Sequence, residues 1–185
     1  MVRYAFVSRD GTEVVFREPK KGDAPQYLKL INDAIAERDS GLLMDRPAKL
    51  RDEERWVSAR IEGVRRRRLV MLAAEVDGTI MGNCDVSREG WKRAHRATLG
   101  IVIAKQLRGK GVGEALMSKT IELAEKRLKG IEFIDLAVFD YNKRAMGLYT
   151  KLGFKEVGRI PRGMKEGSRY FDEILMTRPA KRKKR

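Results

Sequence analysis

The segment Gln106-Leu107-Arg108-Gly109-Lys110-Gly111-Val112-Gly113 joins two runs of different periodicity. Residues 97–104, before it, are rich in Leu, Ile and Val and predict a buried strand, whereas the apolar residues from 112 to 128 recur at helical spacing. Glycines let the backbone approach a ligand closely, and a helix N-terminus offers unpaired N–H groups and a partial positive charge. The segment therefore predicts an anion-binding turn between a strand and a helix.

The spacing within this turn separates it from two other phosphate-binding loops. Position 114 is Glu114, where the dinucleotide fingerprint has glycine, and the nucleotide P-loop needs four residues between its first glycine and its Gly-Lys pair. A diphosphate of another kind is the better candidate, and Arg108 and Lys110 would add positive charge. For this segment alone, the alternative is a tight connection that needs glycine only for its backbone.

Outward from the turn, the chain alternates predicted strands and helices. Asp77-Gly78 is the strongest hairpin signal, and a second hairpin is expected around residues 9–12. Asp23 and Asn142 are candidate helix caps, and Gly130 is expected to end the helix that follows the turn. Strands are predicted at residues 3–8, 13–18, 69–76, 79–87, 97–104, 132–139, 154–159 and 168–177, with a further helix at residues 50–63 and a loop at 161–168.

The order of these elements predicts an α/β fold of the α+β type. Its central sheet would be mixed, with antiparallel N-terminal strands, flanking helices and one parallel crossover, because a strand–helix–strand unit normally makes its two strands parallel neighbours. The length of 185 residues suits a single domain, expected to span residues 1–177. Residues 178–185 would form a basic tail, disordered because like charges repel.

The composition excludes several classes of protein. No apolar run is long enough to cross a bilayer and the N-terminus shows no secretion signal, so we expect a cytoplasmic protein without a membrane partner. One cysteine, Cys84, and one histidine, His95, exclude an internal disulfide and argue against a structural zinc site, so no metal is expected.

The formal net charge of +15 has two interpretations. It is either a solvated, charge-rich surface or a surface that attracts nucleic acid, an acidic protein or a polyanionic cofactor. The basic runs at residues 65–68 and 181–185 contain no interleaved aromatic residues, which a stacking platform for bases would require.

Two motifs in order along the chain resemble the general-control-related N-acetyltransferase (GNAT) superfamily. Gln106-x-x-Gly109-x-Gly111 resembles its pyrophosphate-binding signature, and Asn142-x-x-Ala145-x-x-Leu148-Tyr149-x-x-x-Gly153-Phe154 resembles its downstream motif. The resemblance implies that acetyl-coenzyme A binds as co-substrate and that the two central strands splay apart into a cleft. The implied cofactor-binding residues are Ile101, Val102 and Ile103 for pantetheine, Arg108, Gly109, Lys110, Gly111, Val112 and Gly113 for the pyrophosphate, and Asn142 and Tyr149.

The function implied by this resemblance is transfer of an acetyl group from acetyl-coenzyme A to a primary amine by direct attack. The acceptor would be an amino acid, a small amine, or a protein lysine or N-terminus, and a homodimer is compatible with the sequence. The alternative is a basic, nucleic-acid-associated protein that acetylates, or merely binds, a chromatin or ribosomal partner. A third alternative is an acyl-coenzyme A sensor without turnover.

Tyr149 occupies the position of the family's proton donor to the departing sulfur, and a phenol is protonated at neutral pH. Its alternative role is a core aromatic, because Leu148 and Leu152 beside it are apolar. Asn142 likewise has two compatible roles, as contact to the pantetheine arm and as helix cap.

The motifs do not identify the residue that acts as the general base. His95 falls near the place where several relatives carry a glutamate, and an imidazole can accept a proton near neutral pH, although a lone histidine is more often an ordinary surface or packing residue. Asp85, Glu89 and Asp172 are the other candidates. Cys84 is expected to be a small buried hydrophobe and not an acyl carrier, since neither an adjacent base nor a helix N-terminus is evident to activate it.

Overall fold

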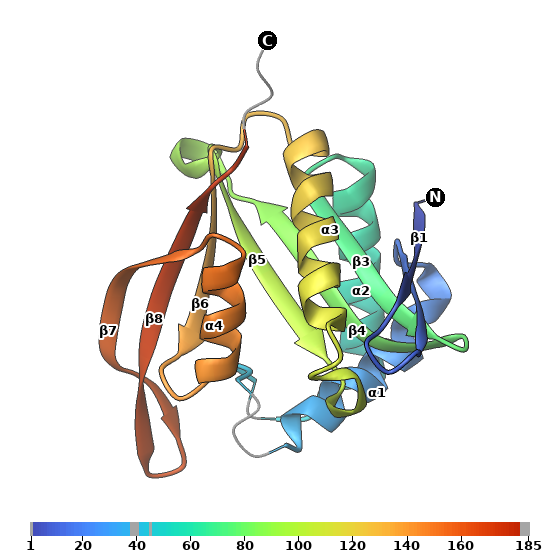
Figure 1. The fold of residues 1–185 in the computed structure, drawn as a ribbon, viewed down its shortest axis with the longest axis horizontal. Coiled ribbons are helices and arrows are strands. Elements are labelled where there is room, and N and C mark those ends of the chain that lie inside the picture. Colours follow the sequence, from blue (N-terminus) through green and yellow to red (C-terminus); the bar gives the residue numbers. More distant parts are fainter. Residues whose placement is uncertain (1, 38–40, 45, 182–185) are drawn as a thin grey trace.

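The computed structural model describes residues 2–37, 41–44 and 46–181. Within them, eight strands form one sheet in the order β1-β2-β3-β4-β5-β6-β8-β7 (Figure 1). The strands are β1 Arg3–Val7, β2 Glu13–Arg17, β3 Leu69–Val76, β4 Thr79–Arg88, β5 Arg96–Ile103, β6 Phe133–Phe139, β7 Lys155–Glu166 and β8 Arg169–Pro179, and the α-helices are α1 Ala24–Ile35, α2 Leu50–Arg65, α3 Val112–Arg127 and α4 Lys143–Lys151.

The sheet is mixed in the way the sequence predicts. Every adjacent pair is antiparallel except β5 and β6, which the crossover through α3 makes parallel. The Asp77-Gly78 turn joins β3 to β4, and the turn after β1 leads directly into β2. The expected α/β architecture, with antiparallel strands first and one parallel crossover, is confirmed.

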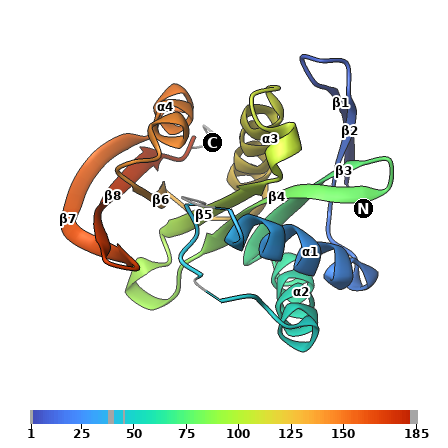
Figure 2. The same cartoon turned by 90° about the horizontal axis from the view of Figure 1, so that it is seen from below.

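Helices cover both faces of the sheet (Figure 2). Alternate residues of β3 divide between the two layers: Val70 and Leu72 pack in the core beneath α3 and α4, whereas Leu69 and Met71 pack in the core beneath α1 and α2. Side chains of a strand point alternately to opposite faces, so a strand covered on both sides is apolar throughout. This explains the unbroken apolar run in the middle of the chain.

The structure places Asp23 at the N-cap position of α1 as predicted, but it corrects the capping role of its side chain and the predicted end of another helix. The side chain of Asp23 does not cap α1: its carboxylate accepts both Nη groups of Arg17, at 2.7 and 2.9 Å, and the backbone N–H of Lys20 at 2.7 Å. A short 3-10 turn, Lys21–Asp23, leads into α1 instead. The helix α3 ends at Arg127, before Gly130, which lies in the following turn at a φ of +81°.

The C-terminal hairpin is longer than predicted. The strand β7 continues to Glu166 through residues expected to form a loop, and β8 continues to Pro179, past the predicted domain boundary at residue 177. Arg178 pairs with Glu125 of α3 at 3.0 Å, and the same carboxylate accepts the backbone N–H of Lys181 at 3.0 Å. Residues 178–181 therefore pack against the domain, while the rest of the expected tail lies outside the described residues.

Within the described ranges, no helix has the length and apolar character needed to span a bilayer.

Candidate active site

The glycine-rich turn lies where β5 ends and α3 begins. Gly109 and Gly111 adopt φ values of +84° and +86°, in the left-handed region that glycine tolerates best, and Gly111 is the N-cap of α3. The first N–H groups of a helix have no acceptor within it, and they carry the positive end of the helix dipole. The turn thus has the geometry of an anion-binding site, as the sequence predicts.

Four cationic side chains surround the turn, and two of them carry partners. The Arg108 guanidinium donates through Nε to the carbonyl of Ile103 at 2.8 Å and through its Nη atoms to Glu37. Lys110 pairs with Asp10 at 2.7 Å, which holds the pKa of that carboxyl well below its usual range. Much of the positive charge that the sequence assigns to Arg108 and Lys110 is therefore neutralised locally.

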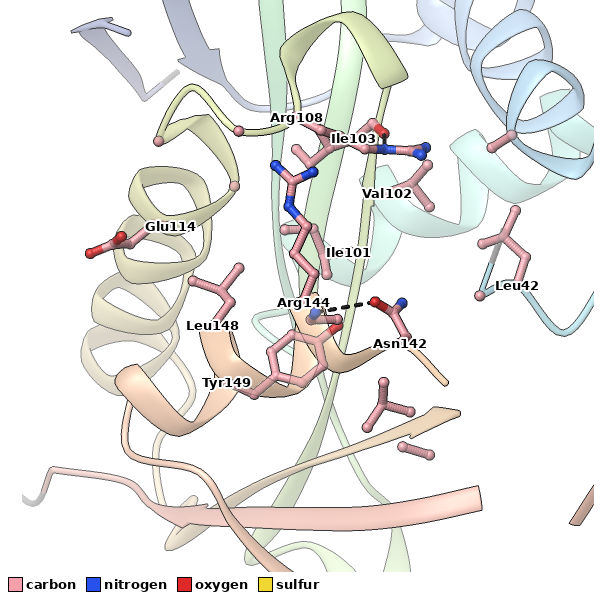
Figure 3. Close-up of a pocket in the computed structure, with 18 of the residues that line it drawn as sticks. Leu42, Ile101, Val102, Ile103, Arg108, Glu114, Asn142, Arg144, Leu148 and Tyr149 are labelled. Carbon is pink, nitrogen blue, oxygen red and sulfur yellow. Dashed lines mark hydrogen bonds between the residues drawn. The ribbon is translucent and has the colours of Figure 1, made fainter. Parts of the chain in front are cut away.

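The other two cations, Arg9 and Arg144, were not identified from the sequence. Both line the cavity beside the turn, and Figure 3 shows Arg144 reaching from α4 toward it. A Cβ built on Gly109 would lie 3.0 Å from Nη2 of Arg144, and one on Gly111 would lie 3.5 Å from Nε of Arg9. The two glycines therefore leave room for these guanidinium groups to stand close to the backbone amides.

Arg9 comes from the turn between β1 and β2, about a hundred residues earlier in the chain. Its backbone N–H donates to the carbonyl of Lys110 at 3.0 Å, which ties the two turns together. No sequence signal links Arg9 to the glycines, because the contact exists only in the folded chain. Arg144 lies two residues after Asn142 within the downstream motif, and its charge was the available signal.

The two parallel strands separate beside this turn. Strand β5 pairs with β6 only from Arg96 to Thr98, at the N-terminal end of both strands. On its other side, β5 pairs with β4 as far as Ile103. The splaying expected from the family resemblance is confirmed, and the backbone of β5 beyond Thr98 has no strand partner in β6 within the part of the sheet that the structure describes.

A cavity of about 410 Å³ occupies this opening (Figure 3). It brings together most of the predicted cofactor-binding residues, with the turn at one end and Tyr149 of α4 at the other. Of the predicted residues, Lys110 and Val112 do not line it: Lys110 pairs with Asp10, and Val112, the first residue of α3, is fully buried. The lining includes Ile101, Val102, Ile103, Arg108, Gly109, Gly111, Gly113, Asn142 and Tyr149.

Asn142 caps α4. Its Oδ1 accepts the backbone N–H of Ala145 at 3.1 Å, shown as the dashed line in Figure 3. The same side chain lines the cavity, and its amide nitrogen lies 3.0 Å from a Cβ built on Gly41. Capping is confirmed, and the amide N–H₂ group is left facing the cavity, which keeps the two expected roles compatible.

Tyr149 lies at the inner end of the cavity and is 8% exposed. Burial, with a smaller contribution from Cys84, raises the pKa of Tyr149 to about 12. The phenol is therefore protonated at neutral pH and can donate a proton. Cys84 itself is fully buried on β4, and burial raises the pKa of its thiol, which agrees with the expected role as a small hydrophobe.

A second cavity, of about 510 Å³, lies between the sheet and the helices α1 and α2. It shares Ile101, Val102, Ala137 and Tyr149 with the first cavity, together with Gly41 and Leu42. The two cavities thus meet at the place where β5 and β6 separate, and Tyr149 lines both.

Asp85 of β4 lines the second cavity. It pairs in register with Gly100 of β5, and its Oδ1 would lie 3.5 Å from a Cβ on that glycine. Arg60 Nη1 and the Ser87 hydroxyl both approach Oδ2, at 3.3 and 3.1 Å. Burial raises the pKa of the Asp85 carboxyl, although Arg60 and Ser87 oppose the shift.

The remaining base candidates lie elsewhere. His95 is exposed, precedes β5 and packs edge-on against Phe133, six residues and about 20 Å of extended chain before Ile101. It lines neither cavity, so the structure does not bring it together with Tyr149. Glu89 accepts a hydrogen bond from Thr98, and Asp172 is held by Arg159 and the backbone N–H of Arg162.

Several residues of the second cavity were missed from the sequence. Tyr27, Glu53 and Trp56 come from α1 and α2, whose sequences carry no motif and read only as amphipathic helices. The available signal was small: Glu53 lies on the same helical face as Trp56 and Val57, where a carboxylate is out of place.

A mixed sheet that opens between two parallel strands, with a glycine turn at the edge of the opening, is the architecture of a coenzyme A-dependent acyltransferase. Residues 33–154 match the model of the "Acetyltransferase (GNAT) family". The chain is also 26% identical over 164 residues to an L-methionine sulfoximine/L-methionine sulfone acetyltransferase of Pseudomonas paraeruginosa, covering 86% of this chain and 91% of that protein.

A thialysine N-epsilon-acetyltransferase of Bos taurus is 32% identical over 151 residues, covering 78% of this chain and 85% of that protein. Among solved structures, a phosphinothricin acetyltransferase of Sinorhizobium meliloti in complex with acetyl-coenzyme A has the same fold, with a TM-score of 0.77 at 17% identity over 90% of this chain and 88% of that one. The chain belongs to the GNAT acetyltransferase family. It is an acyl-coenzyme A-dependent N-acetyltransferase.

Proposed function

We propose that acetyl-coenzyme A binds in the first cavity and that a primary amine reaches its thioester from the second. The observation that carries this proposal is the junction of the two cavities at the gap between β5 and β6, with Tyr149 lining both. The glycine turn would hold the pyrophosphate, the open edge of β5 would hold the pantetheine arm, and the junction would receive the acetyl group.

The residues around the turn fit a diphosphate. The N-terminal amides of α3 supply neutral donors, and Arg9 and Arg144 supply two guanidinium groups with no carboxylate partner among the described residues. Gly109 and Gly111 keep the backbone clear of Cβ atoms where the phosphates would lie. The acetyl-coenzyme A complex of the Sinorhizobium meliloti relative supports the same choice of co-substrate.

The co-substrate supplies an activated acetyl thioester. In the transfer, the amine nitrogen forms a bond to the acyl carbon, the carbon–sulfur bond breaks, and one proton moves from nitrogen to sulfur overall. Tyr149 would donate the proton to the departing thiolate, and its oxygen would be reprotonated from solvent or from the base. Backbone N–H groups on the open edge of β5 would stabilise the oxyanion that forms on the acyl carbonyl.

Asp85 takes the role of general base in this proposal, directly or through one water. It lines the second cavity at the level of Gly100, next to the proposed acetyl position, and its raised pKa makes it a better proton acceptor than an exposed carboxylate. His95 is not part of the proposal, because it lies at the opposite end of β5 from the junction.

Calorimetric titration of the protein with coenzyme A and with acetyl-coenzyme A tests the proposal, followed by mass spectrometry of candidate amines after turnover. We expect saturable heat with both carriers and acceptors heavier by one acetyl group. Absence of heat with both carriers would overturn the placement of the site in the first cavity.

A further inference from the structure

The second cavity carries charges of one sign. Its described lining contains four carboxylates, those of Asp52, Glu53, Asp85 and Glu173, and no lysine, arginine or histidine. An anionic group brought into such a cavity meets repulsion, whereas a cation is attracted more strongly than it would be at an exposed surface.

Glu53 is the carboxylate in this lining that lacks a counter-ion although it is buried. Its side chain is on α2, the residue is 8% exposed, and no hydrogen bond or ion pair of its carboxylate is formed with any residue that the structure describes. Burial raises the pKa of this carboxyl. Asp85, in contrast, is already met by Arg60 at 3.3 Å.

Tyr27 supplies a second, independent sign of a missing partner. It is 2% exposed, lines the same cavity, and its hydroxyl has no hydrogen-bond partner among the described residues. Burial raises the pKa of the phenol, and the charges of Asp23, Asp85 and Glu53 add to the shift while Arg17 opposes it. Tyr27 is thus close enough to Asp85 and Glu53 to feel the charges of these two lining carboxylates. A buried polar group without a hydrogen-bond partner destabilises the protein.

The rest of the lining is apolar. Trp56 packs edge-on against Tyr27 with ring centroids 5.5 Å apart, and Leu30, Leu136 and Phe139 complete walls suited to a methylene chain. The cavity therefore combines Asp85, apolar walls, and an unsatisfied carboxylate and hydroxyl at Glu53 and Tyr27.

We infer, on the basis of the proposed acetyl transfer at this site, that the acceptor is an alkyl diamine. One amine loses its proton beside Asp85 and attacks the thioester, and the second, protonated amine is held by Glu53 and the hydroxyl oxygen of Tyr27. Free amino acids are disfavoured, since their α-carboxylate would be placed among four carboxylates. This preference differs from that of the Pseudomonas paraeruginosa relative, which is named for an amino acid.

Three acceptors of equal chain length separate the contributions: pentylamine, pentane-1,5-diamine and L-lysine. The diamine adds a distal ammonium to pentylamine, and lysine adds a carboxylate to the diamine. We expect kcat/KM for the diamine to exceed that of pentylamine by about 10- to 100-fold, as expected for one hydrogen bond between charged groups. Lysine should be poorer than the diamine by a comparable factor.

The variant Glu53→Gln should lower the ratio of kcat/KM for the diamine to kcat/KM for pentylamine by about 10-fold or more, because the charged partner of the distal ammonium is lost. Glu54→Gln is the matched control, because Glu54 is the next residue of α2, is exposed and does not line the cavity. Glu53→Gln removes an unpaired buried charge, so we expect it to fold at least as well as the native chain.

Calorimetry with coenzyme A bound distinguishes failure of this inference from failure of the proposed function. If acetyl-coenzyme A binds but the diamine binds no more tightly than pentylamine, or Glu53→Gln weakens both amines equally, the diamine assignment is overturned while acetyl transfer stands. If the carrier does not bind, the proposed function fails, and preferential binding of the diamine by the protein alone still supports the cavity's selectivity for a dication.

Discussion

In the proposed mechanism, burial suits two acidic groups, Tyr149 and Asp85, to opposite tasks. Burial raises the pKa of both side chains, because both lose a charge when protonated. For the phenol, this keeps the proton in place at neutral pH, as a donor requires. For the carboxylate, it increases basicity, as an acceptor requires.

Replacing the phenol of Tyr149 by phenylalanine should separate binding from catalysis. We expect Tyr149→Phe to lower kcat by about 10²- to 10⁴-fold, because the thiolate would leave without a positioned proton donor. The dissociation constant of acetyl-coenzyme A should change little, since the hydroxyl is one atom of a large lining. A thiol-release assay combined with calorimetry measures both quantities.

Tyr4→Phe is a suitable control, because Tyr4 lines neither cavity. Its ring lies beneath Lys119, whose Nζ is 4.2 Å from the ring centroid of Tyr4. If Tyr149→Phe turned over at the native rate, the tyrosine would be a packing residue and another group would protonate the sulfur.

Asp85→Asn should change the pH dependence of kcat/KM for the amine. In the proposed mechanism the carboxylate form of Asp85 is the base, so activity should rise as pH increases through the raised pKa of Asp85. Asparagine does not titrate, so the variant should lose that acidic limb as well as activity. A pH–rate profile of both proteins tests this, and an unchanged limb would show that the limb belongs to another group.

The same substitution has a stability consequence of known sign. A folded-state pKa above the unfolded value favours the protonated native carboxyl, so its contribution to stability is present at low pH and is lost as pH rises through the folded pKa. Urea unfolding of Asp85→Asn should therefore show a weaker decline in the free energy of unfolding over that interval than the native chain shows.

Among the elements, the glycine turn and α3 work as one unit. The turn sets the direction of the helix, and the helix presents its first amides at the edge of the opening in the sheet. The turn is fixed from outside by the backbone bond from Arg9 to Lys110. The affinity for coenzyme A should therefore depend on residues that touch the turn from two distant parts of the chain.

Gly111→Asp is expected to lower the affinity for coenzyme A by at least about 100-fold. The new carboxylate would lie beside Arg9, 3.5 Å from the Cβ position, where it would compete with a phosphate and repel it. Calorimetric titration with coenzyme A measures the loss.

Gly78→Asp is the matched control for strain. Gly78 has a similar φ of +76° in the hairpin between β3 and β4, and a Cβ there would meet no atom within 4 Å. Both variants should lose similar stability, so an equal loss of affinity in the control would attribute the effect to strain and not to charge.

How far the sequence predicts each element depends on whether local chemistry decides it. The turn at residues 108–113, the cap at Asn142 and the hairpin at Gly78 are local, and all three were predicted. Asp23 looks like a cap, but the buried Arg17 takes its carboxylate, and this pairing depends on the fold. The extension of β7 through Pro161 likewise depends on its partner, because an edge strand can accommodate a residue that lacks an N–H.

At the scale of the whole molecule, the sequence predicts only one of the two sides of the site. Motifs mark the side that is proposed to contact the co-substrate, since recognition of a diphosphate constrains backbone and glycine in a fixed local order. The side facing α1 and α2 is assembled from Tyr27, Glu53 and Asp85, three residues from three elements. Their positions relative to one another follow from packing across the sheet, which no local pattern in the sequence encodes.

The net charge of +15 should act on the co-substrate before binding. Attraction between a cationic protein and the polyanionic carrier is screened by salt, so kcat/KM for acetyl-coenzyme A should fall as ionic strength rises from about 0.01 to 0.5 M. S-acetylpantetheine lacks the phosphates, and its kcat/KM should change far less. Stopped-flow or steady-state measurements at several salt concentrations test this, and equal slopes for both thioesters would exclude electrostatic steering.

The same charge underlies the alternative of a nucleic-acid-associated protein. Of the basic run at residues 65–68, Arg65 and Arg66 are both bonded to Glu62 on the exposed end of α2. Surface pairing of this kind reduces the charge that a phosphate backbone would meet. The two cavities account for the acetyltransferase function, and this function needs no contribution from the basic run at residues 65–68.

The separation of β5 from β6 opens a gap in the sheet, and the two cavities meet at this gap. Acetyl-coenzyme A would reach the gap between β5 and β6 from the side of α3 and α4, and the acceptor amine from the side of α1 and α2. Neither molecule has to pass through the binding site of the other. The two substrates can therefore bind, and the two products leave, in either order. Mutations on the acceptor side can also change which amine is used while the binding site for acetyl-coenzyme A stays intact.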